Sequence, residues 1–119
     1  MVKKILVVED EEILNSIYSS ELREEGFDTV PALNGRTALG ILEKDKVDLM
    51  ILDIKLPDMN GLQVLEELRK KNTSMPVIIC SAYDPLNTGF FGKEYAGTEY
   101  MVKPVKLNLL KEKIRSLIG

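Results

Sequence analysis

The chain has 119 residues, of which 45% are apolar and 29% charged, and its formal net charge is -3. These values are typical of one compact domain and give no electrostatic reason to expect nucleic acid or an anionic membrane surface as a partner. One cysteine and no histidine exclude an internal disulfide, His-dependent metal sites and catalytic triads that need histidine. No segment resembles a signal peptide or a membrane span, so we expect a cytoplasmic protein.

Five short apolar runs predict β-strands. Residues 47–53 form the most continuous run, with apolar side chains at five of seven positions and no alternation. Such a run is typical of a strand covered on both faces of a parallel sheet. The other predicted strands are residues 4–8, 27–32, 77–80 and 99–102, and Pro31 weakens the second of the five.

Helical patterns separate these strands. The first helix is predicted from the spacing of Ile13, Leu14, Ile17, Tyr18 and Leu22, and Gly26 should end it. After a turn at residues 34–35, residues 38–42 predict a shorter helix, residues 62–71 a third and residues 107–118 the last. Strands that alternate with helices indicate an α/β fold in which helices cover both faces of a parallel sheet.

The segment 84–96 is the least regular part of the pattern. Gly89 and Gly92 each cost about 1 kcal/mol relative to alanine in a helix, so a helix here should be short or irregular. Phe90, Phe91 and Tyr95 fit either contacts with the core or a patch that docks a partner, and the sequence favours neither.

Polar side chains follow four of the predicted strands. Glu9 and Asp10 follow the first strand, Asp53 ends the third, and Ser81 and Lys103 follow the last two. Because the carboxyl ends of parallel strands lie at one edge of the sheet, we expect these side chains to converge there.

Three carboxylates at one edge need a neutralising cation. Two carboxylates about 4 Å apart repel by roughly 4 kcal/mol at an effective dielectric constant near 20. Mg²⁺ suits this need because it binds through one or two carboxylates together with waters and phosphate oxygens. Lys103 should offset part of the charge, and its ammonium can bind a phosphoryl oxygen when phosphate is present.

The whole chain resembles the receiver domain of two-component response regulators, the CheY-like family. The matching features are Glu9-Asp10 after the first strand, Asp53 with the loop that follows it, Ser81-Ala82, and Lys103-Pro104. This resemblance implies a flavodoxin-like, doubly wound sheet of order 2-1-3-4-5 over residues 1–119, a single receiver domain without an output domain in these residues.

The resemblance also implies roles for individual residues. Asp53 would be the phosphoacceptor, taking a phosphoryl group from the phosphohistidine of a sensor histidine kinase or a phosphotransfer protein. Glu9, Asp10 and Asp53 would hold Mg²⁺ together with the backbone carbonyl of Lys55. The chain would then be a switch rather than an enzyme, and it would assist its own phosphorylation and dephosphorylation.

The same resemblance implies how a downstream protein detects phosphorylation. Ser81 is short enough to donate a hydrogen bond to the arriving phosphoryl group, and Tyr100 would follow it inward. The changed face would consist of residues 84–96, 99–102 and 107–118, and a downstream protein would bind it. The Lys103–Pro104 peptide bond resembles one that is cis in the family.

Single residues also have simpler interpretations. Cys80 lies inside an apolar run, which favours buried packing over a reactive thiol. Lys55 and Asp58 can simply face water, and Tyr100 can be an interfacial ring with a hydrated hydroxyl. Only the combination of five polar residues at one sheet edge favours chemistry at Asp53.

Two other functional classes fit less well. A Mg²⁺-dependent phosphohydrolase that forms an aspartyl phosphate is the alternative, but the haloacid-dehalogenase type needs a second aspartate where Lys55 stands and room for a cap. A nucleotide or flavin carrier needs a glycine-rich phosphate loop after the first strand, where residues 9–12 are all acidic. The position of Met1 close to the first strand favours a native N-terminus, while the other end is compatible with either a stand-alone switch or part of a longer protein.

Two residues should control how long the phosphoryl group survives. Lys55 lies two residues after Asp53 and Tyr83 two residues after Ser81, so both should flank the path of an attacking water. We hypothesise a long-lived phosphoryl group because the Tyr83 ring hinders hydrolysis. Decay of the phosphorylated protein should be faster in Tyr83→Ala than in the wild type, and equal rates would remove the argument.

Overall fold

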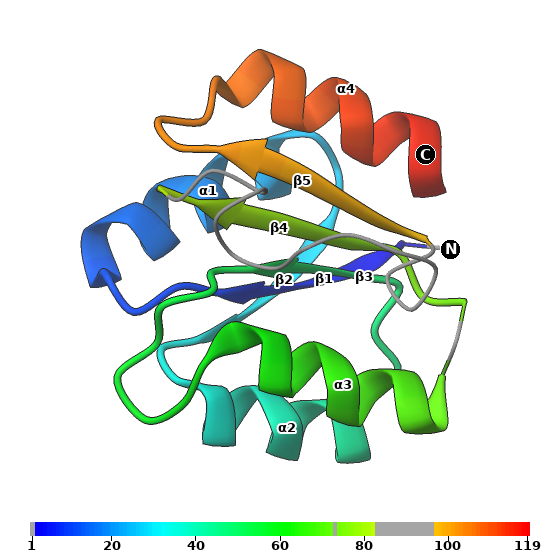
Figure 1. Cartoon of the computed structure of the whole chain (residues 1–119). Coiled ribbons are helices and arrows are strands. Elements are labelled where there is room, and N and C mark those ends of the chain that lie inside the picture. The colour runs from blue at the N-terminus through cyan, green and yellow to red at the C-terminus, as the bar shows by residue number, and fades with distance from the viewer. Residues whose placement is uncertain (1, 73, 83–96) are drawn as a thin grey trace.

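A computed structural model describes residues 2–72, 74–82 and 97–119, which form a five-stranded parallel sheet between two layers of helices (Figure 1). The elements in chain order are β1 (Lys4–Val8), α1 (Glu12–Glu24), β2 (Asp28–Ala32), α2 (Gly35–Lys44), β3 (Leu49–Leu52), α3 (Gly61–Lys71), β4 (Val77–Ser81), β5 (Thr98–Val102) and α4 (Leu107–Ile118).

The strand order is β2-β1-β3-β4-β5, which confirms the predicted order 2-1-3-4-5. β1 lies between β2 and β3, and Val8 at its end is in register with Leu52 at the end of β3. Glu9 and Asp53 therefore leave the sheet side by side, because each follows directly after one of these partners.

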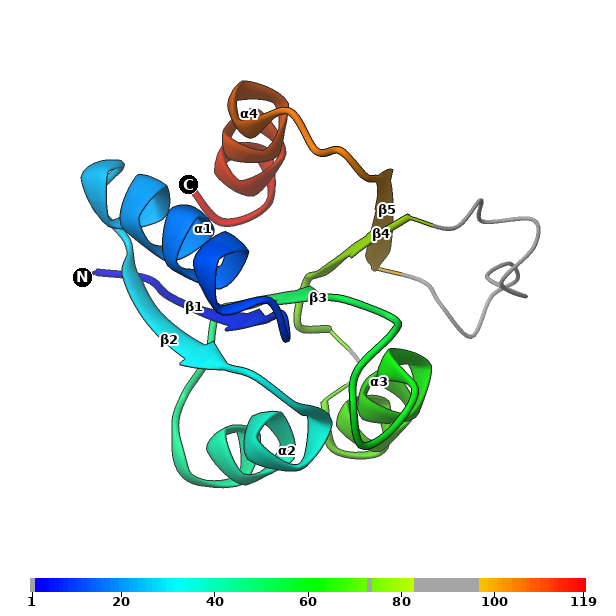
Figure 2. The same cartoon turned by 90° about the vertical axis from the view of Figure 1, so that its left-hand side faces the viewer.

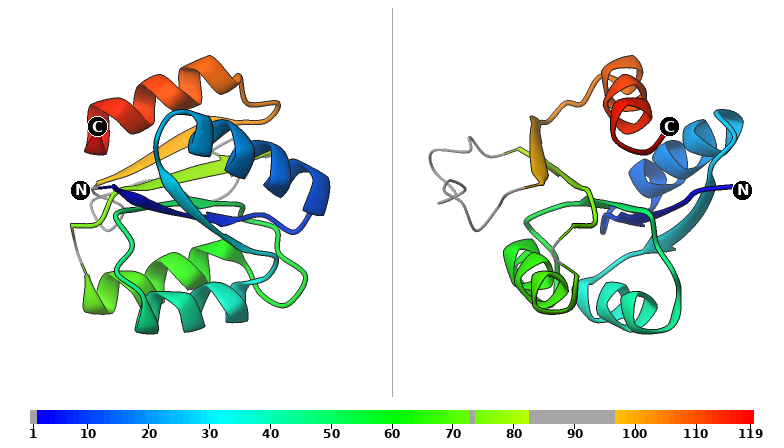
Figure 3. Two further views of the ribbon diagram at one scale, coloured as in Figure 1. Left: turned by 180° about the vertical axis from the view of Figure 1, so that it is seen from behind. Right: turned by 90° about the vertical axis from the view of Figure 1, so that its right-hand side faces the viewer.

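The two faces of the sheet have separate cores. Helices α1 and α4 cover one face, and α2 and α3 cover the other (Figures 2 and 3). Ile5 and Val7 of β1 pack with α1 and α4, whereas Leu6 and Val8 pack with α2 and α3. Because successive side chains of a strand point to opposite faces, a strand buried on both must be apolar throughout, as predicted for β3.

Only part of the apolar series used to predict α1 lies on its buried face. Ile13 is 79% exposed and Ile17 44% exposed, whereas the buried positions of α1 include Asn15 and Ser19. The helix was predicted correctly, and Tyr18 and Leu22 of the series are buried. Buried polar groups with hydrogen-bond partners take positions that hydrophobicity alone would give to isoleucine.

Local contacts explain where two helices begin or end and why β2 tolerates a proline. Gly26 has a positive φ of 96°, which suits glycine, and it follows α1 as predicted. α2 begins at Gly35, earlier than predicted, because the Asn34 side chain accepts a hydrogen bond from the Thr37 N–H at 2.8 Å and caps the helix. Pro31 is tolerated because β2 is an edge strand whose bonds to β1 involve Asp28 and Ala32, out of phase with the proline.

The predicted short helix within 84–96 lies outside the described residues, as do Tyr83, Phe90, Phe91 and Tyr95. None of the helices in the described part of the chain is long and apolar enough to cross a membrane.

The start of α3 lies against the backbone of Asp53. The Gly61 N–H donates to the Ile54 carbonyl at 2.5 Å, and a Cβ atom at Gly61 would lie 2.1 Å from the Asp53 carbonyl oxygen. Only glycine allows this approach without a shift of the backbone that carries Asp53.

We therefore expect Gly61→Ala to lower the free energy of unfolding by about 1–3 kcal/mol, as in other overpacked sites. Gly40→Ala is the matched control, since a Cβ atom there would meet nothing within 4 Å and should raise stability by about 0.5–1 kcal/mol. Urea unfolding followed by circular dichroism measures both, and equal effects of the two changes would contradict the role assigned to Gly61.

Candidate functional site

Three carboxylates converge where β1 and β3 end. Carboxylate oxygens of Glu9, Asp10 and Asp53 all lie within 4.8 Å of one another. Glu9 is 2% exposed and Asp53 7% exposed, while Asp10 faces solvent. Their backbones are tied to the sheet, because the Glu9 N–H donates to the Ala32 carbonyl and the Asp53 N–H to the Val8 carbonyl, each at 3.0 Å.

Lys103 brings a positive charge to the buried pair. Its Nζ lies 2.5 Å from Oε1 of Glu9 and 3.2 Å from Oδ2 of Asp53. Its backbone N–H donates to the Ser81 carbonyl at 2.7 Å, which holds Lys103 beside the end of β4. The Lys103–Pro104 peptide bond is cis, as expected.

One ammonium does not neutralise three carboxylates. All three carboxylates have oxygens within 4.8 Å of one another, and at that separation two unit charges repel by roughly 3 to 4 kcal/mol at an effective dielectric constant near 20. Burial raises the pKa of Asp53 above its ordinary value although Lys103 opposes the shift, and burial likewise raises the pKa of Glu9. Burial alone would lower the pKa of Lys103, but the two carboxylates outweigh it and raise that pKa.

The loop after β3 is held in place at both ends. The Lys55 N–H donates to Oδ1 of Asp53 at 3.3 Å, and Lys55 forms a β-bridge with Asn60 while remaining exposed. Asp58 does more than face water, because its carboxylate accepts the N–H groups of Gly35 and Arg36 at 2.8 and 2.9 Å. A carboxylate at the start of α2 is stabilised by the free N–H groups of the helix end, so Asp58 ties this loop to α2.

The structure describes most of the remaining predicted residues, but not all of them. Ser81 is buried at the end of β4, and Tyr100 is half-buried and packs against the core beneath α2 and α3. Tyr83 lies outside the described residues. Cys80 is buried in the opposite core, and burial raises the pKa of its thiol to about 12, so the predicted packing role is confirmed.

Asn15 is a residue of this region that the sequence reasoning missed. It is 2% exposed, and its side-chain amide lies among backbone carbonyls at the ends of β1 and β2. A polar residue that shares a helical face with Tyr18 and Leu22 was the signal that could have revealed it.

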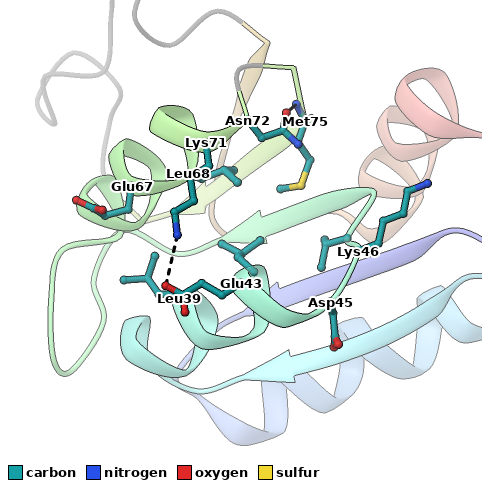
Figure 4. A pocket seen from close by; sticks show the side chains of 11 residues that line it. Leu39, Glu43, Asp45, Lys46, Glu67, Leu68, Lys71, Asn72 and Met75 are labelled. Atoms are coloured by element: carbon teal, nitrogen blue, oxygen red, sulfur yellow. Dashed lines mark hydrogen bonds and ion pairs between the residues drawn. The ribbon is translucent and has the colours of Figure 1, made fainter.

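A hollow of about 210 Å³ lies at the opposite end of the sheet, between the C-terminal parts of α2 and α3 (Figure 4). Its lining includes the apolar side chains of Leu39, Leu68 and Met75, and an ion pair of 3.4 Å between Lys71 and Glu43 links the two helices beside it. This hollow belongs to the packing of the helices and is remote from the carboxylate cluster.

The model of the response regulator receiver domain family matches residues 5–115. Among curated relatives, the probable transcriptional regulatory protein TcrX of Mycobacterium tuberculosis is 34% identical over 114 residues, which cover 96% of this chain and 49% of TcrX. Sporulation initiation phosphotransferase F of Bacillus subtilis is 30% identical over 118 residues, which cover 99% of this chain and 95% of that protein. The chain belongs to the response regulator receiver domain family.

Solved structures agree with this assignment. The response regulator TrrA of Thermotoga maritima, in complex with Mg²⁺-BeF, is 36% identical with a TM-score of 0.86, and the match covers 98% of this chain and 100% of TrrA. TrrA in complex with the histidine kinase ThkA matches with the same identity and a TM-score of 0.85, over 99% of this chain and 100% of TrrA. The predicted fold and family are thus confirmed.

The raised pKa of Asp53 predicts how stability depends on pH. A carboxyl group with a higher pKa in the folded than in the unfolded state binds more protons when folded, so its ionisation opposes folding as pH rises above the ordinary value of 3.8. Without divalent cations, Asp53→Asn should therefore be more stable than the wild type at neutral pH and lose this advantage below that value. Urea unfolding across this pH range measures the difference.

Asp58→Asn is the matched control, because its effect on stability at neutral pH should have the opposite sign. The N–H groups of Gly35 and Arg36 lower the pKa of Asp58, so its ionised form stabilises the fold and that contribution disappears as pH falls. Asp58→Asn should lose stability at neutral pH. If the wild type and Asp53→Asn are equally stable at neutral pH, the ionised Asp53 carboxylate does not oppose folding and the inference is wrong.

Proposed function

We propose that this chain is a phosphorylation-controlled switch in which Asp53 is the phosphoacceptor. The observation that carries the proposal is the position of the Lys103 ammonium, 3.2 Å from Oδ2 of Asp53 and 2.5 Å from Oε1 of Glu9. A phosphoryl group on Asp53 would bring its negative oxygens next to this cation. Lys103 would then stabilise the product as a fixed point charge.

The carboxylate cluster fits Mg²⁺ as the cofactor. Glu9, Asp10 and Asp53 supply oxygen donors from three residues within 4.8 Å of one another, a donor set that hard divalent cations prefer. We assign the Lys55 backbone carbonyl as a further ligand. When bound, Mg²⁺ would neutralise the excess charge and favour the approach of an anionic phosphoryl donor. The Mg²⁺-BeF complex of TrrA supports this assignment.

The proposed transfer is an in-line displacement at phosphorus. A carboxylate oxygen of Asp53 forms a bond to the phosphorus atom while the bond between phosphorus and the donor histidine nitrogen breaks, and that nitrogen leaves with the electron pair. The backbone contacts of Asp53 to Val8 and of Gly61 to Ile54 hold the nucleophile still during the transfer. Ser81 donates a hydrogen bond to the transferred group.

The proposed partners are a phosphohistidine donor and a protein that reads the result. The complex of TrrA with the histidine kinase ThkA supports a kinase as the donor. The chain spans about half the length of TcrX, so the output of the whole protein is proposed only as a protein-mediated response. Ser81 and Tyr100 would carry the change to the surface of β5 and α4, and Lys55 and Tyr83 would limit hydrolysis.

Incubation with acetyl phosphate tests this function without the kinase. The wild type should gain the mass of one phosphoryl group when Mg²⁺ is present and little without it, since the cluster must be neutralised before an anion approaches. Asp53→Asn should gain none, because the amide oxygen cannot form the acyl phosphate.

Asp28→Asn is the control, because Asp28 is an exposed aspartate at the start of β2, at the opposite end of the parallel sheet from the cluster. It should be phosphorylated like the wild type. Phosphorylation of Asp53→Asn to the wild-type level would contradict the proposed role of Asp53.

A further inference from the structure

Asn15 occupies an unusual place for a polar side chain. It lies within α1 on the face that packs against the sheet, and it is 2% exposed. Burying an amide costs free energy unless its donors and acceptor find partners, so a buried asparagine within a helix indicates specific contacts.

The partners of the amide are backbone carbonyls at the end of the sheet. Nδ2 of Asn15 lies 3.0 Å from the Glu9 carbonyl oxygen, 3.1 Å from that of Val7 and 3.3 Å from that of Ala32. An amide nitrogen has two hydrogens, so the two shorter contacts are full hydrogen bonds and the longest shares a hydrogen. Asn15 therefore joins the ends of β1 and β2 to α1.

A second buried side chain completes the hydrogen bonds of the amide. The hydroxyl of Ser19, one helical turn further along α1, donates to Oδ1 of Asn15 at 3.2 Å. Because the three carbonyls can only accept, Nδ2 must face them, and this orientation does not depend on the Ser19 hydroxyl. The whole arrangement is buried, which strengthens each bond and makes an unpaired group costly.

The Glu9 carbonyl belongs to the peptide group that joins Glu9 to Asp10. A hydrogen bond to this carbonyl sets the plane of the peptide and hence the directions in which the two acidic side chains leave the backbone. The Glu9 carboxylate has its own restraints in Lys103 and the Glu11 N–H, at 2.5 and 3.0 Å. Asn15 acts on the backbone beneath both carboxylates.

We propose that Asn15 is a positioning residue that sets the affinity of the Glu9, Asp10 and Asp53 cluster for Mg²⁺. The inference rests on the magnesium site proposed above and adds to it a residue that acts only through the backbone. Groups that orient metal ligands commonly change metal affinity by 10–100-fold when removed. Without the Asn15 amide, the peptide between Glu9 and Asp10 loses the restraint on its carbonyl, and the ligands are less firmly preset.

Titration calorimetry with MgCl₂ tests the proposal directly. Asn15→Leu keeps the size of the side chain but removes the donors, and it should raise the Kd for Mg²⁺ roughly tenfold. Ser19→Ala is the matched control, because it removes a buried hydrogen bond of the same network and leaves the donors to the Glu9 carbonyl in place. Its Kd should stay within about twofold of the wild-type value.

Unfolding by urea without Mg²⁺ separates positioning from simple stabilisation. Both variants should lose stability, but only Asn15→Leu should lose affinity. A wild-type Kd in folded Asn15→Leu, or an equal rise in Ser19→Ala, would overturn the proposal. A wild-type protein that does not bind Mg²⁺ would instead overturn the proposed metal site itself.

A measurement on the wild type covers the case in which Asn15→Leu does not fold. Binding of Mg²⁺ should restrain the backbone that the amide holds, so hydrogen exchange of the Asn15 side-chain amide, followed by NMR, should slow at saturating MgCl₂. The side-chain amide of Asn72, beyond the end of α3, is the internal control and should not change. No slowing at Asn15 relative to Asn72 would overturn the proposal.

Discussion

The ammonium of Lys103 lies between the buried carboxylates of Glu9 and Asp53, and the arrangement of the sheet edge depends on this contact. Parallel strands bring the acidic residues together, and their repulsion would oppose folding if no cation were near. One lysine offsets only part of the charge of three carboxylates, and burial raises the pKa of both Glu9 and Asp53 despite the opposing effect of Lys103. The remaining negative charge makes the edge suited to a divalent cation.

Contacts from three helices keep this edge rigid. Gly61 at the start of α3 approaches the Asp53 backbone, Asp58 ties the loop after β3 to the start of α2, and Asn15 of α1 holds the carbonyls after β1. Each contact acts on a backbone segment that carries a carboxylate. Such rigidity suits phosphoryl transfer, in which positioning and charge neutralisation provide most of the catalysis.

Much of the fold could be predicted from the sequence, because continuous apolar strands and short loops leave few arrangements for an α/β chain. The polar residues at the strand ends were also identified, and the structure places Glu9, Asp10, Asp53 and Lys103 together. The supporting contacts were not predicted. Asp58 is exposed, but its hydrogen bonds to the start of α2 were not foreseen. Ile13 and Ile17 of the series that predicted α1 are exposed, whereas Asn15 and Ser19 are buried.

The sequence by itself determined the strands, the family and the residues that carry charge at the ends of the strands. These follow from local composition, since hydrophobic runs and their polar ends can be identified along the chain without knowledge of distant contacts. Only the tertiary structure decided which side chains hold the charged ones in place. Asn15 meets the Ala32 carbonyl, and Asp58 meets Gly35, across 17 and 23 positions of the sequence. Such pairs form only when the packed sheet and helices bring distant backbone groups within hydrogen-bonding distance.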